Sequence, residues 1–206
     1  MRWLRFDTVA VNVGPGLFEA YGHGPADGTE RPVRQRIQNG TGGWTEADTP
    51  ATMFYAGDGH NHWHVRDFQY WTIASVNERA KVLSSGAKTG YCFWDNYDYK
   101  ATAGVLYHPN TTSACIRLPD GTVPMGLSVG WGDEYPSNIA YQYIDITGLG
   151  NGKYIVTLEA DPGNEFRELN ETDGMTWAQT NNTSWAEINI TRKGVTVLPT
   201  GTDLER

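Results

Sequence analysis

The sequence lacks long apolar runs and an excess of basic charge. No stretch approaches the roughly 18 apolar residues of a membrane-spanning helix, and residues 1–7 lack the apolar core of a signal peptide. We therefore expect a soluble chain with no membrane partner. With 16 lysines and arginines against 24 aspartates and glutamates, the net charge is −8. Nucleic-acid binding requires clustered basic residues, so the balance argues against a nucleic-acid partner and favours cationic ones.

Nucleotide-binding signatures are also missing. The sequence contains neither the glycine-rich phosphate loop nor the dinucleotide-binding fingerprint before a helix. A G-x-S-x-G pattern covers residues 126–130, but a hydrolase elbow needs a helix after the serine. The following residues show no helical periodicity, so we interpret Ser128 as an ordinary loop serine.

Cysteine is scarce: Cys92 and Cys115 are the only two. They could form one intrachain disulfide or remain two reduced core residues. Both cysteines flank turn-rich sequence, where a cross-link would tether a long loop. We therefore favour the disulfide. It would close a loop of about 24 residues and stabilise the fold by about 3 kcal/mol.

The apolar pattern is typical of strands, because apolar and polar residues alternate. Val9, Val11 and Val13 share one face of an early strand. Aromatic and β-branched residues predict further strands at 68–73, 139–146, 154–158 and 185–190.

Turn signals separate these segments, and 24 glycines and 10 prolines disfavour long helices. Residues 77–83 are the only stretch that permits a helix. We predict a single domain over residues 1–206, an all-β antiparallel β-sandwich with a Trp/Tyr-rich core, long loops and little helix.

Three of the five histidines lie within five residues, at His60, His62 and His64. Residues at i, i+2 and i+4 of a strand point to the same side, so the three imidazoles share a face if the segment is extended. If the strand is bent, they can reach one metal ion, and three protein ligands with an open position indicate a reactive site. Imidazole suits zinc, iron, nickel and copper, with affinity rising toward copper.

Other interpretations of the histidines are weaker. A solvent-facing strand could carry them by coincidence, and an expression tag would be a contiguous run at a terminus. His23 and His108 stand alone beside glycine or proline, and we interpret both as exposed loop residues.

Four ordered motifs carry a resemblance to a known family. They are His60–His64, Lys88–Cys92 with Asp95 close behind, Trp131–Tyr135 and Gln142–Thr147. In motif, order and spacing the sequence resembles the catalytic domain of the lysyl oxidases, in the style of the short microbial members, from about residue 4 to residue 190. The histidine motif alone would not be specific, whereas the four together are.

The resemblance implies roles for individual residues. The three clustered histidines match the family's copper ligands, and the two cysteines match a family disulfide. Lys88 and Tyr135 match the pair that family members join covalently, under copper and oxygen, into lysine tyrosylquinone. Without the resemblance, Lys88 would be interpreted as a surface lysine and Tyr135 as a core or loop tyrosine.

The implied reaction oxidises a primary amine, either a small amine or a peptidyl lysine. The amine condenses with a quinone carbonyl, a base removes a proton from the adjacent carbon, and hydrolysis releases an aldehyde. Molecular oxygen then restores the quinone and yields hydrogen peroxide. We predict that Asp133 is the base, because its side chain and that of Tyr135 project together from an extended segment. Asp95 and Asp145 are alternatives, and Asp133 could instead orient a histidine.

Two further expectations, a calcium site and the cellular location of the protein, rest on indirect signals in the sequence. Residues 168–173 and 181–182 resemble the family's calcium-binding acidic turn, but an insertion stretches it and the partner strand is missing, so calcium stays an open alternative. The paired cysteines and the resemblance predict a secreted or extracellular protein, despite the missing signal peptide.

Two other classes of function compete with the amine oxidase. One is a non-enzymatic copper- or zinc-binding β-sandwich that keeps the histidines but never matures a quinone. The other is a carbohydrate-binding or adhesion module, suggested by eight tryptophans and eleven tyrosines on a β-rich frame.

Overall fold

The structure is a computed structural model that describes most of the chain. The described residues are 1–24, 30–38, 43–57, 59, 61–86, 88, 90–101, 115–168 and 182–202. Across these ranges the secondary structure consists of strands and turns without a helix, which confirms the all-β prediction. No helix among them is long and apolar enough to cross a membrane.

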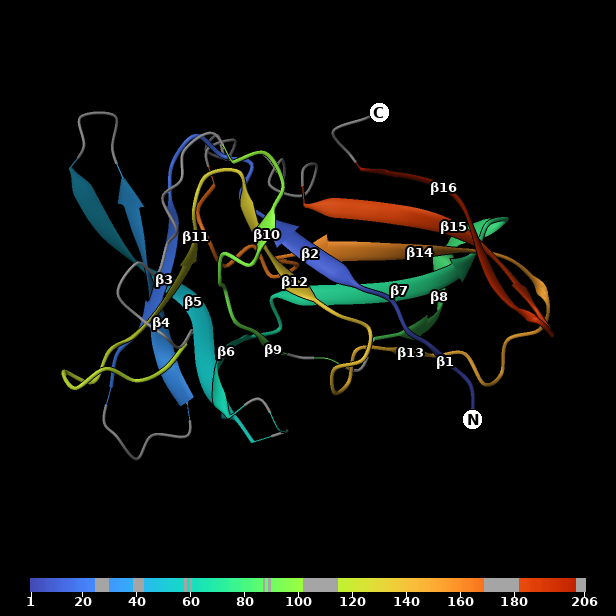
Figure 1. The fold of residues 1–206 in the computed structure, drawn as a ribbon, viewed down its shortest axis with the longest axis horizontal. Coiled ribbons are helices and arrows are strands. Elements are labelled where there is room, and N and C mark those ends of the chain that lie inside the picture. Colours follow the sequence, from blue (N-terminus) through green and yellow to red (C-terminus); the bar gives the residue numbers. More distant parts are fainter. Residues whose placement is uncertain are drawn as a thin grey trace.

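The largest sheet has six antiparallel strands and lies at the left of Figure 1. In spatial order these are β11 (Val123–Leu127), β3 (Phe18–Gly22), β4 (Glu30–Gln38), β5 (Trp44–Ala56), β6 (His62–Arg66) and β9 (Gly90–Tyr91). A three-stranded sheet packs against it. Its strands are β10 (Tyr97–Asp98), β12 (Trp131–Tyr135) and β2 (Thr8–Val11).

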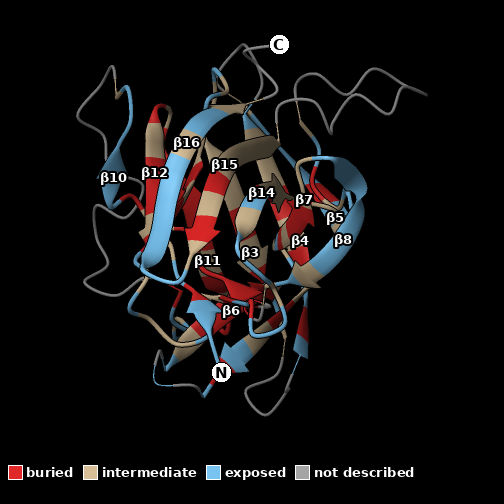
Figure 2. Ribbon diagram, turned by 90° about the vertical axis from the view of Figure 1, so that its right-hand side faces the viewer, coloured by how far each residue is buried: buried red, intermediate tan, exposed pale blue. Residues whose placement is uncertain are grey.

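A five-stranded sheet occupies the right of Figure 1. Its order is β16 (Gly194–Thr202), β15 (Thr183–Thr191), β14 (Gly152–Ala160), β7 (Gln69–Ser75) and β8 (Glu78–Ser85). The two-stranded sheet of β1 (Trp3–Leu4) and β13 (Ile144–Asp145) packs on it. Figure 2 shows the edge strands β16 and β8 as mostly exposed.

The buried side chains form two clusters, one for each pair of sheets. The first lies between the six-stranded and three-stranded sheets and is rich in aromatic residues and methionine. The second lies between the five-stranded and two-stranded sheets and is mainly aliphatic around Trp71. The predicted sandwich is therefore confirmed as a fold class. The expected single Trp/Tyr-rich core is instead divided into two, and in the described chain only Trp63 and Trp71 are buried tryptophans.

Strand predictions succeed where side-chain alternation is clear. Residues 154–158 lie in β14, residues 185–190 in β15, and most of 68–73 in β7. The early strand is β2, but Val13 lies beyond its end, and the valine face is half-buried whereas Thr8 and Ala10 are buried.

One strand prediction fails for an identifiable reason. Residues 139–146 are mostly irregular, with only Ile144–Asp145 extended, because the amides of Ile139 and Gln142 donate to the nearby carbonyls of Pro136 and Ile139. Of residues 77–83, the stretch that permits a helix, 78–83 lie in β8 and Asn77 lies in the turn before it. This segment follows a tight turn after β7 and completes a hairpin with it.

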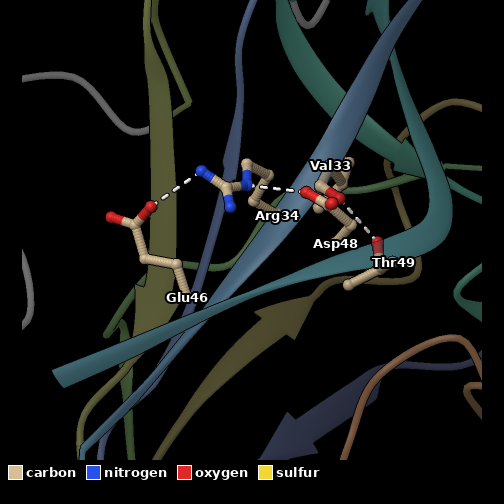
Figure 3. A network of polar contacts seen from close by, with 5 residues as sticks. All are labelled: Val33, Arg34, Glu46, Asp48 and Thr49. Atoms are coloured by element: carbon tan, nitrogen blue, oxygen red, sulfur yellow. Dashed lines mark hydrogen bonds and ion pairs between the residues drawn. The ribbon is translucent and has the colours of Figure 1, made fainter.

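The hairpin of β4 and β5 carries a charged ladder on its exposed side. The Arg34 guanidinium lies between two carboxylates, 2.8 Å from Glu46 Oε2 and 2.8 Å from Asp48 Oδ1 (Figure 3). On the same hairpin, the Thr49 hydroxyl donates to the Val33 carbonyl at 2.7 Å. These contacts link β4 to β5 across the hairpin.

Candidate active site

Strand β6 brings two of the predicted metal ligands together. His62 and His64 lie two residues apart on this strand, while Trp63 between them is buried in the first core. The His64 ring is 1% exposed and His62 is half-buried. Their Nε2 atoms are 2.8 Å apart.

This separation fits two ligands of one metal ion. It is a hydrogen-bond distance, and it also equals the spacing of two nitrogens that each lie about 2.0 Å from one ion and subtend about 90° there. His60 lies outside the described residues. Among the described residues there is no group of three potential ligands. Just before β6 the chain departs from the extended conformation, because Asn61 has a φ of 53°.

Two contacts hold β6 in place. The predicted disulfide between Cys92 and Cys115 is confirmed, and the Cys115 carbonyl accepts a 2.9 Å hydrogen bond from the Trp63 amide. On the other side, Gly90 approaches His64 so closely that a Cβ there would lie 2.8 Å from His64 Cβ and 2.9 Å from its Nδ1. Only glycine fits beside this imidazole without a shift of its neighbours.

Tyr135 ends strand β12 with its ring in the first core, 5% exposed. Its ring centroid is 6.4 Å from that of His64, so the tyrosine lies beside the histidine pair. The Tyr91 ring stacks on it, with centroids 4.3 Å apart and planes inclined by 22°. The Cys92 amide donates a 2.7 Å hydrogen bond to the Tyr135 hydroxyl oxygen.

Lys88 reaches the same ring from the segment before β9. Its Nζ lies 4.8 Å from the centroid of Tyr135, and the residue is only 8% exposed. Residues 88–92 therefore supply an amine, a stacked ring and an amide to one side chain. The structure thus brings together the two residues of the expected quinone pair, although no covalent bond joins them.

Asp133 lies two residues before Tyr135 and is 3% exposed. Its Oδ1 accepts a 2.7 Å hydrogen bond from the Asn96 side-chain amide. Burial raises the pKa of the Asp133 carboxyl well above its ordinary value, and Asp95 and Glu134 add to the increase. The bond from Asn96 and the ammonium of Lys88 lower this pKa by less. A carboxyl of this kind is suited to accept a proton.

The alternative bases have other surroundings. The Asp95 carboxylate is buried and accepts the Ser128 amide at 2.9 Å. Asp145 is exposed on β13, where hydrogen bonds from the Thr147 hydroxyl and amide lower the pKa of its carboxyl. Ser128 is buried and strand β12 follows it where a hydrolase elbow requires a helix, in keeping with its interpretation as a non-catalytic serine.

A pocket of about 330 Å³ opens beside His62, Asp133 and Tyr135. Its lining includes His62, Trp94, Asn96, Asp133, Tyr135 and Ile139. Its lining combines carboxylate and imidazole groups with aromatic and aliphatic side chains. Such a pocket can accommodate an alkyl chain with a basic end.

Sequence reasoning missed Tyr91, Asn96 and Gly90 as site residues. Tyr91 and Gly90 lie within a recognised motif, but only Lys88 and Cys92 there had an assigned role. Asn96 also fixes β12, because its side-chain oxygen accepts the Glu134 amide at 2.6 Å. No local pattern identifies these residues, since their partners lie on distant strands.

The calcium prediction falls mostly outside the described residues. At its ends, the Asn182 side chain donates a 2.8 Å hydrogen bond to Glu168 Oε1. His23 is exposed, as expected, and His108 lies outside the described residues.

The chain is similar in sequence to a known protein family. A family model described as lysyl oxidase matches residues 33–196. The chain is 30% identical over 118 residues to human protein-lysine 6-oxidase, and the match covers 56% of this chain and 25% of the relative. Mouse lysyl oxidase homolog 4 is 26% identical over 117 residues, and zebrafish lysyl oxidase homolog 3A is 27% identical over 115. Each of these two matches covers 14% of the relative.

The fold and the buried groups describe an all-β protein with a paired-histidine site beside a lysine and a tyrosine. Because the family model matches most of its length, the chain belongs to the lysyl oxidase family. The matched region spans about a quarter or less of the curated relatives.

Proposed function

We propose that this protein is a copper-dependent amine oxidase whose quinone cofactor forms from Lys88 and Tyr135. The observation that carries the proposal is the position of the Lys88 Nζ, 4.8 Å from the Tyr135 ring centroid inside a buried core. Lysine is rarely buried in proteins, and here the buried amine lies over the tyrosine ring with which the family resemblance pairs it. Family membership supports the same type of activity.

The histidines would hold the copper ion. The 2.8 Å separation of the His62 and His64 Nε2 atoms supports both as ligands, and His60 is the third we propose. Bound copper would supply one-electron oxidation of the Tyr135 ring, with oxygen as the terminal oxidant. The mature quinone would supply an electrophilic carbonyl that withdraws electrons from the carbon bearing the amine.

Residues of the pocket would carry out proton transfer and substrate binding. Asp133 accepts the proton from that carbon at its carboxylate, and Asn96 holds Oδ1 so that the carboxylate keeps one orientation. Trp94 and Ile139 line the route for the methylene groups of the substrate. The net reaction converts a primary amine, oxygen and water into an aldehyde, ammonia and hydrogen peroxide.

The substrates we propose are small primary amines or lysine side chains of peptides. The net charge of −8 would attract both. The Cys92–Cys115 disulfide supports action in an oxidising, extracellular compartment. Calcium is not part of the proposal.

The decisive experiment is peptide mapping of the full chain after treatment with copper in air. A covalently joined peptide that contains Lys88 and Tyr135 is expected, together with a coloured phenylhydrazine adduct. Tyr135→Phe and Lys88→Met should lose the joined peptide and this adduct, while copper binding is retained. Separable peptides in a copper-loaded protein that does not react with phenylhydrazine would refute the proposal.

The converging histidine pair also fits the second candidate, a metal-binding protein without a quinone. That candidate predicts copper binding with no hydrogen peroxide from any amine. The same mapping experiment, combined with a peroxide assay, separates the two functions.

A further inference from the structure

Tyr91 is a buried tyrosine with no assigned role. It is 1% exposed, and its ring stacks almost parallel on Tyr135, with centroids 4.3 Å apart. Phe68 and Phe93 pack around it, with centroids 5.6 Å and 5.4 Å away. Tyr91 therefore covers one face of the Tyr135 ring and is itself packed within an aromatic cluster.

The hydroxyl of Tyr91 makes a second set of contacts. It donates a hydrogen bond to the backbone carbonyl of Asp133 and accepts one from the Ala10 amide at 3.2 Å. Ala10 and Asp133 are partners in the register of β2 and β12. The phenol thus ties the backbone of the proposed base to the neighbouring strand.

We infer that Tyr91 is a positioning residue. Its side chain holds in place both the Tyr135 ring, which is the quinone precursor, and Asp133, which is the proposed base. The inference rests on the proposed function. A tyrosine ring turns about a single bond, and a parallel neighbour at stacking distance restricts that rotation. With one face covered, Lys88 and later the substrate must approach the other face or the edge. The Tyr91 hydroxyl holds the backbone of Asp133 in a fixed position relative to the Tyr135 ring.

Two substitutions distinguish the contribution of the Tyr91 ring from that of its hydroxyl. Tyr91→Phe keeps the stacked ring and removes both hydroxyl contacts, whereas Tyr91→Met fills similar space without a planar ring. In Tyr91→Met, we expect the cross-link between Lys88 and Tyr135 to form about a hundredfold more slowly, the cost of a misplaced reacting group. In Tyr91→Phe, the cross-link should form normally, while kcat falls and KM stays unchanged.

Aromatic NMR of the copper-free protein gives a readout that does not depend on catalysis. The Tyr135 ring signals, assigned by their loss in Tyr135→Phe, should be shifted by the ring current of residue 91. The shift should persist in Tyr91→Phe and collapse in Tyr91→Met. Thermal unfolding of each variant controls for folding.

The outcomes distinguish the two proposals. If the wild-type protein forms no cross-link but the NMR shift behaves as expected, the proposed function fails and the positioning of the ring stands. If Tyr91→Met keeps the wild-type ring shift and cross-linking rate, the ring contributes nothing and the inference is overturned. If Tyr91→Met does not fold, a wild-type kcat in Tyr91→Phe overturns the role of the hydroxyl.

Discussion

The two cores of this protein differ in what they bury. The core against the five-stranded sheet consists mainly of isoleucine, leucine and valine around Trp71. Beside the other core, the chain buries His64, Lys88 and Asp133 next to Tyr91 and Tyr135. Burying ionisable groups costs free energy, which aliphatic packing elsewhere can offset. We therefore expect substitutions in the two regions to separate stability from activity.

The largest effect should come from Asp133→Asn, which should lower amine turnover by about 10²–10⁴-fold, the usual contribution of a general base. Asparagine keeps the shape and can still accept the bond from Asn96. Asp145→Asn, on an exposed carboxylate outside the proposed machinery, is the matched control and should turn over amines normally. Normal turnover in Asp133→Asn would exclude Asp133 as the base.

The stability of Asp133→Asn should also depend on pH differently from that of the wild-type protein. Because the folded pKa of Asp133 is raised, the unfolded chain releases this proton at lower pH than the folded protein does. Ionisation therefore favours unfolding as pH rises through this range. Asp133→Asn removes the effect, so its stability relative to wild type should rise from pH 4 to pH 7 in urea titrations. A constant difference would contradict the raised pKa.

In the aliphatic core, Ile73→Ala should cost about 2–5 kcal/mol of unfolding free energy, because it leaves a cavity at a fully buried position. Val82→Ala, on an exposed position of the same sheet, should change stability by about 0.5 kcal/mol or less. Both folded proteins should bind copper and form the adduct as wild type does. Loss of the adduct in folded Ile73→Ala would mean that the two cores are not independent.

Removal of the disulfide should affect both the stability of the fold and the formation of the Lys88–Tyr135 cross-link. Replacing Cys92 and Cys115 with alanine should cost about 3 kcal/mol, since the bridge restricts the unfolded chain. The Cys92 amide bonds to Tyr135 and the Cys115 carbonyl to Trp63, so cross-link formation should also slow. Mass spectrometry and denaturant titration test the two parts separately.

A smaller effect is expected from Gly90→Ala, which should weaken copper binding by about 10–100-fold, as displaced supports of metal ligands do. The added methyl would press on His64. Gly57→Ala, just after β5 where an added Cβ would meet no atom within 4 Å, is the control. Equal copper affinities for the two variants would show that His64 tolerates the displacement.

The smallest effect is expected on the hairpin of β4 and β5. Arg34→Ala removes two ion pairs whose side chains are well exposed, and it should cost about 0.2–1 kcal/mol. High salt should reduce the difference further. A loss of several kcal/mol would indicate that this hairpin couples to the buried site.

The sequence by itself determined what depends on near neighbours along the chain. Alternation identified β7, β14 and β15, and the two-residue spacing placed His62 and His64 within reach of each other. The same spacing brought Asp133 and Tyr135 to one pocket. Residues 139–146 show the limit, because local turns competed there with an apparently regular pattern.

Only the tertiary structure decided the contacts between distant strands. The Cys92–Tyr135 hydrogen bond joins residues 43 positions apart. The stacking of Tyr91, the bond from Asn96 and the fit of Gly90 against His64 likewise join segments that are distant in the sequence. Before the structure, the pairing of Lys88 with Tyr135 rested on family resemblance alone. The physical reason is that side-chain periodicity fixes which face a residue takes, whereas strand order and register fix which residue it meets.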